Sequence, residues 1–415
     1  MRKLALISTV FAIVLSCAET IDQNNTDDGG YQGTEVPDNA PVCVFDFIDA
    51  RNNPISVSEV ILISDALEVS PVIIKPDSPS KYVVMDIKRM VNQIATYHFF
   101  VTAGDGKTYH ASKDMYLPNG RRHDKSIELA RSAPTLLTDR SSWKVSQVRE
   151  GLIWYNFEGH EPITDTEQVI NVLELELAGD NLKLEFLYFP DRAKISEVAR
   201  GDAGLVAIAN ASYGSGFTSG LPVDNTYIRV DGVTYKEIGL SPDDSNYGKH
   251  ESALWYDGVS EIGFIDMPGD FAAALEYYKS TTYPNLFSSY PMLIKNFEKV
   301  DFSAYRKKIS KTTVDPRTVL GVTYDGKLII MTVDGRWKNK ATGMTLVQVQ
   351  DFLMMHFYPK YAINMDGGGS TSMFIKGEDV VNYPCEGVSG SSEKTYNGTF
   401  KERGLVTYFG IREIK

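Results

Sequence analysis

The stretch Tyr361-Ala-Ile-Asn-Met-Asp-Gly-Gly-Gly-Ser-Thr-Ser-Met-Phe-Ile375 decides the fold of the C-terminal part of the chain. Its first five residues are mostly apolar and predict a buried strand, which ends at an aspartate followed by three glycines. Glycine in such a place permits a sharp turn, or lets the backbone approach a ligand closely. Because Met373–Ile375 predicts another strand, the glycines are expected to lie between two strands.

The loop Asn364–Ser372 carries groups that could hold an oxyanion. Consecutive exposed amides can form an anion-binding nest, and Ser370 and Thr371 add hydroxyl donors. The strand fixes the carboxylate of Asp366, and Asn364 lies two residues earlier on the same face. A Walker A loop is excluded because no Gly-Lys-Ser/Thr follows, and a serine-hydrolase elbow because Gly-x-Ser-x-Gly is absent. A functional site and a tight structural turn both stay open.

Two arginines belong to the hairpin that precedes the loop. Val319–Tyr324 and Lys327–Val333 are predicted to pair through Asp325-Gly326, a turn that requires two positive φ angles. Arg317 begins this hairpin and Asp334-Gly-Arg336 ends it. Arginine suits bidentate contact with phosphate or carboxylate, and surface salt bridges are the alternative for each side chain.

Other segments indicate an α+β C-terminal domain over residues 145–415, with a mixed β-sheet and a few helices. A strand at 205–209, apolar on both faces, leads to Asn210. The alternating runs 169–177 and 182–188 are predicted to form a hairpin through 178–181. Helices are expected at 195–200, at 270–279 and after Thr345, which forms a capping box with Gln348.

Residues 41–140 predict a smaller all-β domain of the sandwich type. Short alternating runs at 42–48, 60–63, 81–87 and 97–102 are separated by turn residues, which favours antiparallel pairing. No cluster of chemically competent side chains occurs here, so the domain is interpreted as a spacer or a binding module. Its histidines, at 98, 110 and 123, are scattered.

The first 17 residues predict a lipoprotein signal peptide. Arg2 and Lys3 precede a 12-residue apolar run, which is too short to span a bilayer, and the run leads to Ser16-Cys17. This order resembles the lipobox of bacterial lipoproteins, in which Cys17 would carry the lipid; an ordinary secretory signal is the alternative. Residues 18–40 are polar and predict a flexible tether. We therefore expect an exported bacterial protein, anchored by lipid in the cell envelope.

Composition limits the classes of partner. The 415 residues carry a formal net charge of −12, which argues against nucleic-acid binding. Membrane contact is expected only through the N-terminal lipid. Cys43 and Cys385 could pair in an oxidising compartment or stay free as buried thiols. No Cys-x-x-Cys or Cys/His cluster occurs, so a structural zinc site is not expected. No cofactor is expected either, although a structural divalent cation such as calcium stays open.

Six short motifs in order resemble the phosphodiester glycosidase family. They are Ala207-Ile-Ala-Asn-Ala-Ser-Tyr213, Pro316-Arg-Thr-Val-Leu-Gly321, Val333-Asp-Gly-Arg336, Gly343-Met-Thr-Leu346, Asn364-Met-Asp-Gly-Gly-Gly-Ser-Thr371 and Glu402-Arg403. The resemblance covers roughly residues 145–415. One departure is that Asn210-Ala-Ser-Tyr213 stands where the family usually has Asn-Gly-Gly-Phe, so the extra side chains could narrow the site.

The resemblance implies hydrolysis of a sugar-1-phosphodiester at the anomeric carbon, with a sugar phosphate or glycan as substrate. It implies catalytic roles for Asp366, Asp334 and Arg336, and binding roles for Asn210, Arg317, Asn364, Gly367, Gly368, Gly369, Ser370, Thr371 and Arg403. Asp366 is the favoured catalytic carboxylate, against a role in holding the loop or a metal. The alternative function is a non-catalytic, surface glycan- or cell-wall-binding lipoprotein. A metal-dependent phosphodiesterase is disfavoured because the histidines of this part, at 160, 250 and 356, are widely spaced.

Overall fold

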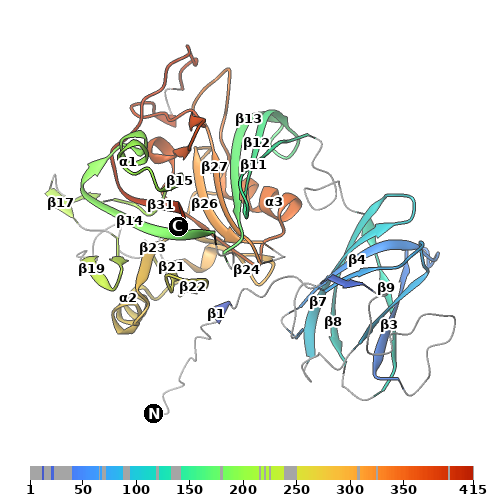
Figure 1. Cartoon of the computed structure of the whole chain (residues 1–415). Helices are drawn as coiled ribbons and strands as arrows, with labels where there is room; N and C mark the ends of the chain where they lie inside the picture. The colour runs from blue at the N-terminus through green and yellow to red at the C-terminus, as the bar shows by residue number, and fades with distance from the viewer. Residues whose placement is uncertain are drawn as a thin grey trace. The chain divides into compact units, whose positions relative to one another are not determined.

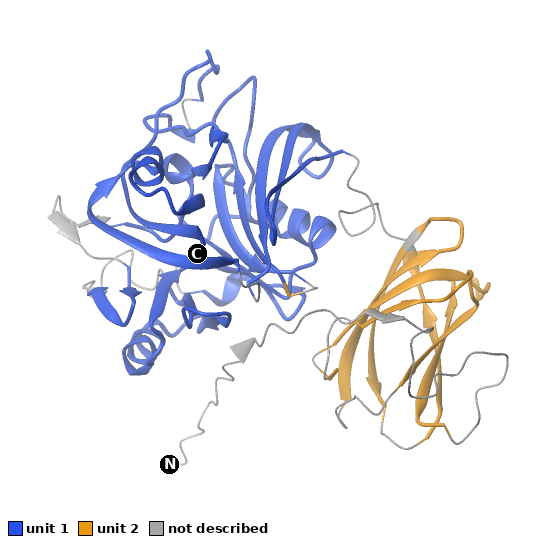
Figure 2. Ribbon diagram, in the orientation of Figure 1, with its two compact units in different colours: residues 1–15, 141–323, 327–415 blue, residues 16–140, 324–326 orange. Residues whose placement is uncertain are grey.

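A computed structural model of the chain describes residues 12–13, 20–22, 40–64, 66–67, 72–86, 94–117, 121–131, 142–177, 181–214, 216–218, 221–223, 226–237, 250–305, 309–323, 326–390 and 393–414. Contacts divide the chain into two units (Figure 2). The N-terminal unit is residues 16–140 with 324–326, and the C-terminal unit is residues 1–15, 141–323 and 327–415. The predicted lipobox with Cys17 and most of the tether lie outside the described residues. Within the described part, no helix is long and apolar enough to cross a membrane.

The N-terminal unit contains two sheets (Figure 1). The first has the order β10-β8-β7-β4-β5-β2, and the second β6-β3-β9. The strands are β2 (Thr20–Asp22), β3 (Val42–Ile48), β4 (Val57–Ile63), β5 (Val72–Lys75), β6 (Tyr82–Asp86), β7 (Ile94–Ala103), β8 (Thr108–Tyr116), β9 (His123–Glu128) and β10 (Ala130–Arg131). The prediction of purely antiparallel pairing is wrong, because β3 and β9 run parallel and so do β5 and β2, the latter a short strand within the predicted tether. Their wide separation along the chain leaves room for the crossover that parallel strands need.

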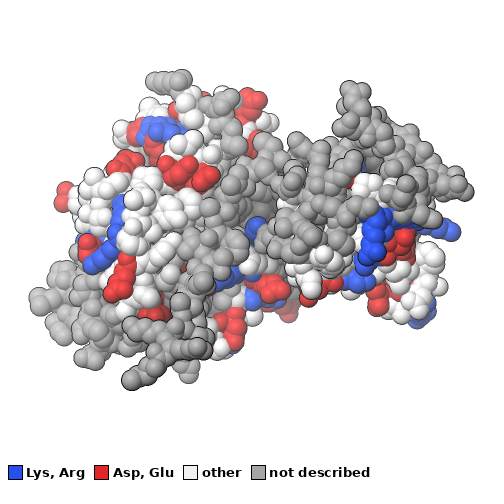
Figure 3. Space-filling model, turned by 90° about the horizontal axis from the view of Figure 1, so that it is seen from below, with Lys and Arg blue, Asp and Glu red and all other residues white. Residues whose placement is uncertain are grey.

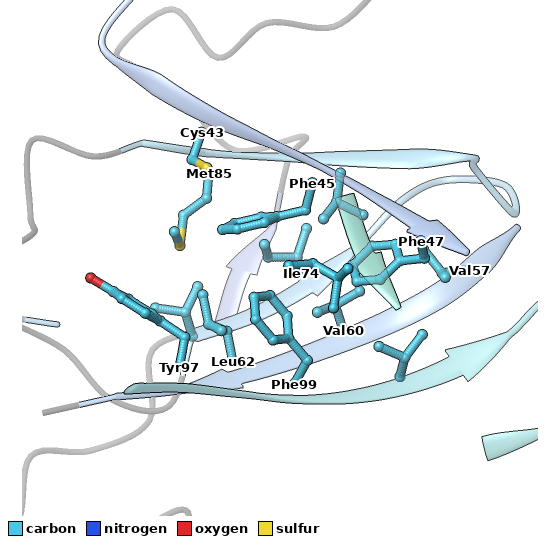
Figure 4. Close-up of a cluster of buried hydrophobic side chains, with 14 of the residues drawn as sticks. Cys43, Phe45, Phe47, Val57, Val60, Leu62, Ile74, Met85, Tyr97 and Phe99 are labelled. Atoms are coloured by element: carbon cyan, nitrogen blue, oxygen red, sulfur yellow. The ribbon is translucent and has the colours of Figure 1, made fainter. Parts of the chain in front are cut away.

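Alternation along the strands builds one core between these two sheets. Phe45 and Phe47 of β3 point toward Phe99 of β7, with edge-to-face ring centroids 5.1 and 6.2 Å apart (Figure 4). All three rings are fully buried. The four predicted strands of this region coincide with β3, β4, β6 and β7 to within a few residues.

The C-terminal unit has three larger sheets and one two-stranded ribbon, β16-β17. The eight-stranded sheet has the order β11-β12-β13-β27-β26-β28-β24-β25, the five-stranded sheet β14-β31-β15-β29-β30, and the six-stranded sheet β1-β22-β21-β23-β18-β19. Their strands are β1 (Ala12–Ile13), β11 (Lys144–Arg149), β12 (Leu152–Glu161), β13 (Thr166–Leu175), β14 (Leu182–Ala193), β15 (Leu205–Asn210), β16 (Gly216–Thr218), β17 (Leu221–Val223), β18 (Ile228–Val230), β19 (Val233–Lys236), β21 (Ser252–Tyr256), β22 (Ile262–Asp266), β23 (Asn285–Ser289), β24 (Met292–Lys295), β25 (Glu298–Lys299), β26 (Arg317–Val322), β27 (Leu328–Val333), β28 (Tyr361–Asn364), β29 (Met373–Ile375), β30 (Asp379–Val380) and β31 (Leu405–Glu413).

Two predictions about these sheets need correction. The strand pairs described in the C-terminal unit are antiparallel, not mixed; β15 is buried on both faces without any parallel neighbour. The predicted hairpin of 169–177 with 182–188 is also wrong, because β13 pairs with β12 and β27, whereas β14 pairs with β31. The turn residues between them mark a reversal of the chain, but they do not determine which strand each neighbour joins.

Helices cover parts of the sheets at the predicted places. They are α1 (Ile195–Gly201), α2 (Phe271–Ser280) and α3 (Leu346–His356), with the short 3-10 turns η2 (Phe302–Ala304) and η3 (Gly368–Ser370). The predicted capping box at Thr345 and Gln348 is confirmed. Phe186 of β14 packs on Phe287 of β23 at 4.5 Å, which joins the five- and six-stranded sheets.

Cysteine and surface charge complete the description. Cys43 and Cys385 are both free and buried. On the face shown in Figure 3, acidic and basic side chains are interspersed over the described residues.

Candidate active site

The glycine-rich loop connects two sheets at the place where several strands end. β28 of the eight-stranded sheet leads into the loop, and β29 of the five-stranded sheet follows it. β26 begins beside the end of β28, and β27 ends opposite Arg317. In the other sheet, Asn210 ends β15 next to the start of β29. The topology therefore brings the candidate residues from both sheets to one region.

Close contacts explain why the first two glycines are needed. A Cβ on Gly367 would lie 2.6 Å from the carbonyl oxygen of Pro316, which is backbone and cannot move aside easily. Gly368 has a φ of +60°, and a Cβ there would lie 2.9 Å from Nη2 of Arg336. Both positions thus exclude side chains, and the second also needs the left-handed conformation that glycine adopts without strain.

The predicted nest of consecutive free amides is not formed. The amide of Gly368 donates to Pro316 O at 2.9 Å, and those of Ser370 and Thr371 donate to Gly367 O and Gly368 O, both at 3.2 Å. The loop closes instead as the 3-10 turn η3. Among the described hydrogen bonds, only the amides of Gly367 and Gly369 in this run are left without an acceptor, so oxyanion binding must depend mainly on side chains.

Asn210 holds the glycine-rich loop in place through hydrogen bonds on its buried side. Its Nδ2 donates to the carbonyl of Asp366 at 2.6 Å, and its Oδ1 accepts from the Thr318 hydroxyl at 2.8 Å and from the Ser372 amide at 3.0 Å. The side chain is fully buried. Because each of these bonds holds a neighbouring segment, the predicted binding residue Asn210 is a positioning residue in this structure.

Asp334 also lies behind the loop. Its carboxylate is buried and accepts from Asn382 Nδ2 at 2.7 Å and from the Tyr383 amide at 2.9 Å. Asn382 in turn donates to Thr371 O at 3.2 Å. Burial raises the pKa of Asp334 to about 7, although the two donated hydrogen bonds act in the opposite direction. These contacts place Asp334 as a support for the loop, away from solvent.

Two of the three arginines are already paired with carboxylates. Arg336 bonds to Asp315 through Nε at 3.0 Å and Nη2 at 2.9 Å, and donates from Nη1 to Val388 O at 2.6 Å. Arg403 bonds to Glu386 at 2.5 Å and to the Ser370 hydroxyl at 3.1 Å. A Cβ on the third glycine, Gly369, would lie 2.6 Å from Arg403 Nη2. The guanidinium groups of Arg336 and Arg403 therefore cover the loop, and the carboxylates of Asp315 and Glu386 neutralise their charges.

Arg317 is different. Its Nε donates to Met344 O at 2.9 Å and its Nη2 to Thr313 O at 2.6 Å, both neutral carbonyls. Among the ion pairs of the described residues, Arg317 has no carboxylate partner. Burial lowers the pKa of Arg317, and nearby Asp315 acts in the opposite direction. A partly exposed guanidinium without a counter-ion is suited to bind an anion.

The partly exposed front of the site combines Arg317 with Asp366 and two tyrosines. Asn364, which is buried, donates from Nδ2 to the Tyr213 hydroxyl at 3.1 Å and to Tyr290 O at 3.0 Å. Asp366, Tyr213 and Tyr290 are each partly exposed. Burial raises the pKa of Tyr290 to about 12, and Arg317 acts in the opposite direction. A cation, a carboxylate and two neutral phenols thus meet at this point.

Sequence reasoning missed several members of the site. Tyr290, Asn382 and Glu386 lie outside the motifs, and nothing in their local sequence distinguishes them from ordinary surface or strand-end residues. Asp315 directly precedes the Pro316-Arg317 motif, so its position was the one available signal. The side chains of Ala211 and Ser212 were expected to narrow the site. Both are instead buried, and the Ser212 hydroxyl donates to Ser288 O.

The arrangement can hold a monoanion and place one carboxylate beside it. Ser370 and Thr371 are buried and shape the loop, while Asp366 is the partly exposed carboxylate. Among the described residues, no group of three or more His, Cys, Asp or Glu side chains is placed to hold a metal ion.

Comparison with known proteins identifies a family. The profile of the phosphodiester glycosidases matches residues 203–411. The curated proteins give no match. Among solved structures, the catalytic domain of zebrafish N-acetylglucosamine-1-phosphodiester alpha-N-acetylglucosaminidase, described as auto-inhibited by its pro-peptide, is 18% identical with a TM-score of 0.44, over 68% of this chain and 87% of that chain. A hypothetical protein from Synechocystis is 13% identical with a TM-score of 0.43, over 77% and 74% of the two chains.

Proposed function

Because the chain belongs to the phosphodiester glycosidase family, we propose that it hydrolyses a sugar-1-phosphodiester at the anomeric carbon. The products are the free sugar, such as N-acetylglucosamine, and a phosphomonoester. One observation carries the proposal: Arg317, with no carboxylate partner among the described ion pairs, begins β26 beside the end of β28, which leads to the partly exposed Asp366. Arg317 provides the group that binds the phosphate, and Asp366 provides the group that activates the attacking water.

In the proposed reaction, a water oxygen forms a bond to the anomeric carbon while the bond from that carbon to the phosphate oxygen breaks. Asp366 takes the proton of the water, and the electron pair of the broken bond leaves on the phosphate. A phosphate monoester is a good leaving group, so the acid that ordinary glycosidases supply for an alkoxide is not required. Arg317 stabilises the charge that develops on the departing phosphate. The reaction written in this way needs no cofactor.

The test measures sugar release from an α-linked N-acetylglucosamine-1-phosphodiester. Asp366→Asn should abolish release while the fold is kept, and Asp379→Asn is the matched control because that carboxylate pairs with Arg200 at the surface. In water labelled with oxygen-18, the label should enter the sugar and not the phosphate. Label in the phosphate would show cleavage at phosphorus, and wild-type turnover by Asp366→Asn would remove that residue from the mechanism. Inversion at the anomeric carbon is expected; retention would show that a carboxylate attacks first.

A non-catalytic glycan-binding protein is the rival function. It predicts that the wild type binds the sugar phosphodiester and releases no product over long incubation. We also propose that the chain is exported and lipid-anchored through Cys17, which rests on the apolar run and the Ser16-Cys17 sequence. Cys17→Ser should prevent incorporation of labelled fatty acid and release the protein from the membrane fraction.

A further inference from the structure

Tyr213 is a residue of the site whose ring is held by aromatic neighbours. It follows the end of β15, and its ring packs edge-on against His250 at 5.2 Å and lies 6.3 Å from the ring of Tyr290. The residue is partly exposed, while its neighbours Ala211 and Ser212 are buried. Of these three residues, Tyr213 is therefore the one that a ligand can reach.

Two hydrogen bonds connect the Tyr213 hydroxyl to Asn364 and Tyr290. Its oxygen accepts from Asn364 Nδ2, and the carbonyl of Tyr290 fixes the orientation of that amide because Nδ2 also donates there. The phenol proton is directed to the same carbonyl at 3.5 Å, which is long for an O–H···O bond. An oxygen of a ligand at ordinary distance would make a shorter hydrogen bond than this contact.

The surrounding charges make Tyr213 a donor rather than a base. Burial raises the pKa of Tyr213 far above its ordinary range, Asp366 raises it further, and Arg317 acts in the opposite direction. The phenol consequently keeps its proton at all physiological pH values. Both groups that the proposed reaction uses, the Arg317 guanidinium and the Asp366 carboxylate, thus act electrostatically on this hydroxyl.

We propose that Tyr213 is a phosphate-binding residue, whose hydroxyl donates a hydrogen bond to a non-bridging oxygen of the substrate phosphate beside Arg317. The proposal rests on the proposed function for the identity of the substrate, but anion binding at Tyr213 can be tested without turnover. Tyr213 and Arg317 together form the phosphate site, and Asp366 stands on the side of the sugar. The neutral phenol adds a donor without adding charge, so it strengthens binding without changing the charge balance.

The test combines phosphate binding with two substrates. Inorganic phosphate is titrated calorimetrically into the wild type, Tyr213→Phe and Ser212→Ala, the last of which loses a neighbouring hydroxyl that donates to Ser288 O. The same proteins are assayed on the sugar phosphodiester and on the 4-nitrophenyl glycoside of that sugar, which has no phosphate. Phenylalanine keeps the ring contacts of Tyr213, and thermal unfolding of each variant verifies the fold.

Tyr213→Phe should weaken phosphate binding and lower kcat/KM for the phosphodiester, each by roughly ten- to a hundredfold. Its kcat/KM on the aryl glycoside should stay within about twofold, and Ser212→Ala should match the wild type throughout. Equal losses on both substrates, unchanged phosphate affinity in Tyr213→Phe, or no phosphate binding by the wild type would each overturn the proposal. Absence of turnover by the wild type would refute the glycosidase function alone, because the titration still reports on Tyr213.

Discussion

Gly367→Ala isolates the steric requirement of the loop from its chemistry. The new methyl group would lie 2.6 Å from the carbonyl oxygen of Pro316, whereas ordinary contact begins at 3.4 Å. Since the obstacle is backbone, the loop or the start of β26 must shift by several tenths of an ångström. The same oxygen accepts the amide of Gly368 at 2.9 Å, so the shift also weakens that bond.

The steric conflict and the weakened hydrogen bond together determine how much stability Gly367→Ala should lose. Forcing an extra methyl group into a packed site costs about 1–3 kcal/mol, and weakening one buried hydrogen bond adds about 1 kcal/mol. We expect Gly367→Ala to lower the free energy of unfolding of the C-terminal unit by about 2–4 kcal/mol, and to reduce activity because Asp366 moves with the loop.

Urea unfolding followed by tryptophan fluorescence measures this change in one unit only, because the four tryptophans, at 143, 154, 255 and 337, belong to the C-terminal unit. Gly201→Ala is the control: a Cβ at that position meets nothing within 4 Å, so stability should be unchanged or slightly raised. A loss below about 0.5 kcal/mol for Gly367→Ala would refute the steric argument, since a substitution without a structural conflict changes stability by no more than that.

Further predictions concern the support and the charge of the site. Asn210→Ala leaves a carbonyl, an amide and a hydroxyl without their buried partner, so it should lower the unfolding free energy by about 2–4 kcal/mol in the same urea experiment; a neutral effect would contradict its bracing role. Arg317→Ala should weaken binding of inorganic phosphate about tenfold or more, measured by calorimetry, whereas Arg200→Ala at a surface pair should not change it. Burial raises the pKa of Asp334 to about 7 from an unfolded value near 3.8, so its contribution to stability is full below pH 4 and is lost as the pH rises toward 7. Thermal unfolding of the wild type and Asp334→Asn between pH 4 and 8 tests this: the pH dependence of the difference between them should reach at most about 4 kcal/mol, and parallel curves would show that Asp334 titrates normally.

Local signals predicted elements well, and pairing poorly. The strands around 205–209, 319–333 and 361–365, and the capped helix after Thr345, lie where periodicity and turn chemistry placed them. The hairpin assigned to 169–177 and 182–188 failed because alternation shows which face of a strand is buried, not which strand covers its edge. The parallel pair β3 and β9 was missed for the same reason.

The site was predicted in its position and only partly in its roles. The motif order brought Arg317, Asp366 and the glycines to one region. The roles of Asn210 and Asp334 depend on hydrogen bonds to Ser372, Asn382 and Tyr383, which are set by strand pairing and cannot be read from local sequence. The carboxylate partners of Arg336 and Arg403 come from loops without a motif, so sequence alone could not separate the compensated arginines from Arg317.

This separation has a consequence for the proposed reaction. A phosphodiester carries one negative charge, and Arg317 offers one positive charge that is not paired with a carboxylate among the described residues. The phosphomonoester product acquires a second negative charge near neutral pH, because its second pKa is about 6. Arg336 and Arg403 cannot compensate that charge without giving up Asp315 and Glu386. The charge of Arg317 therefore balances the substrate phosphate but not the doubly charged product, which favours release of the product.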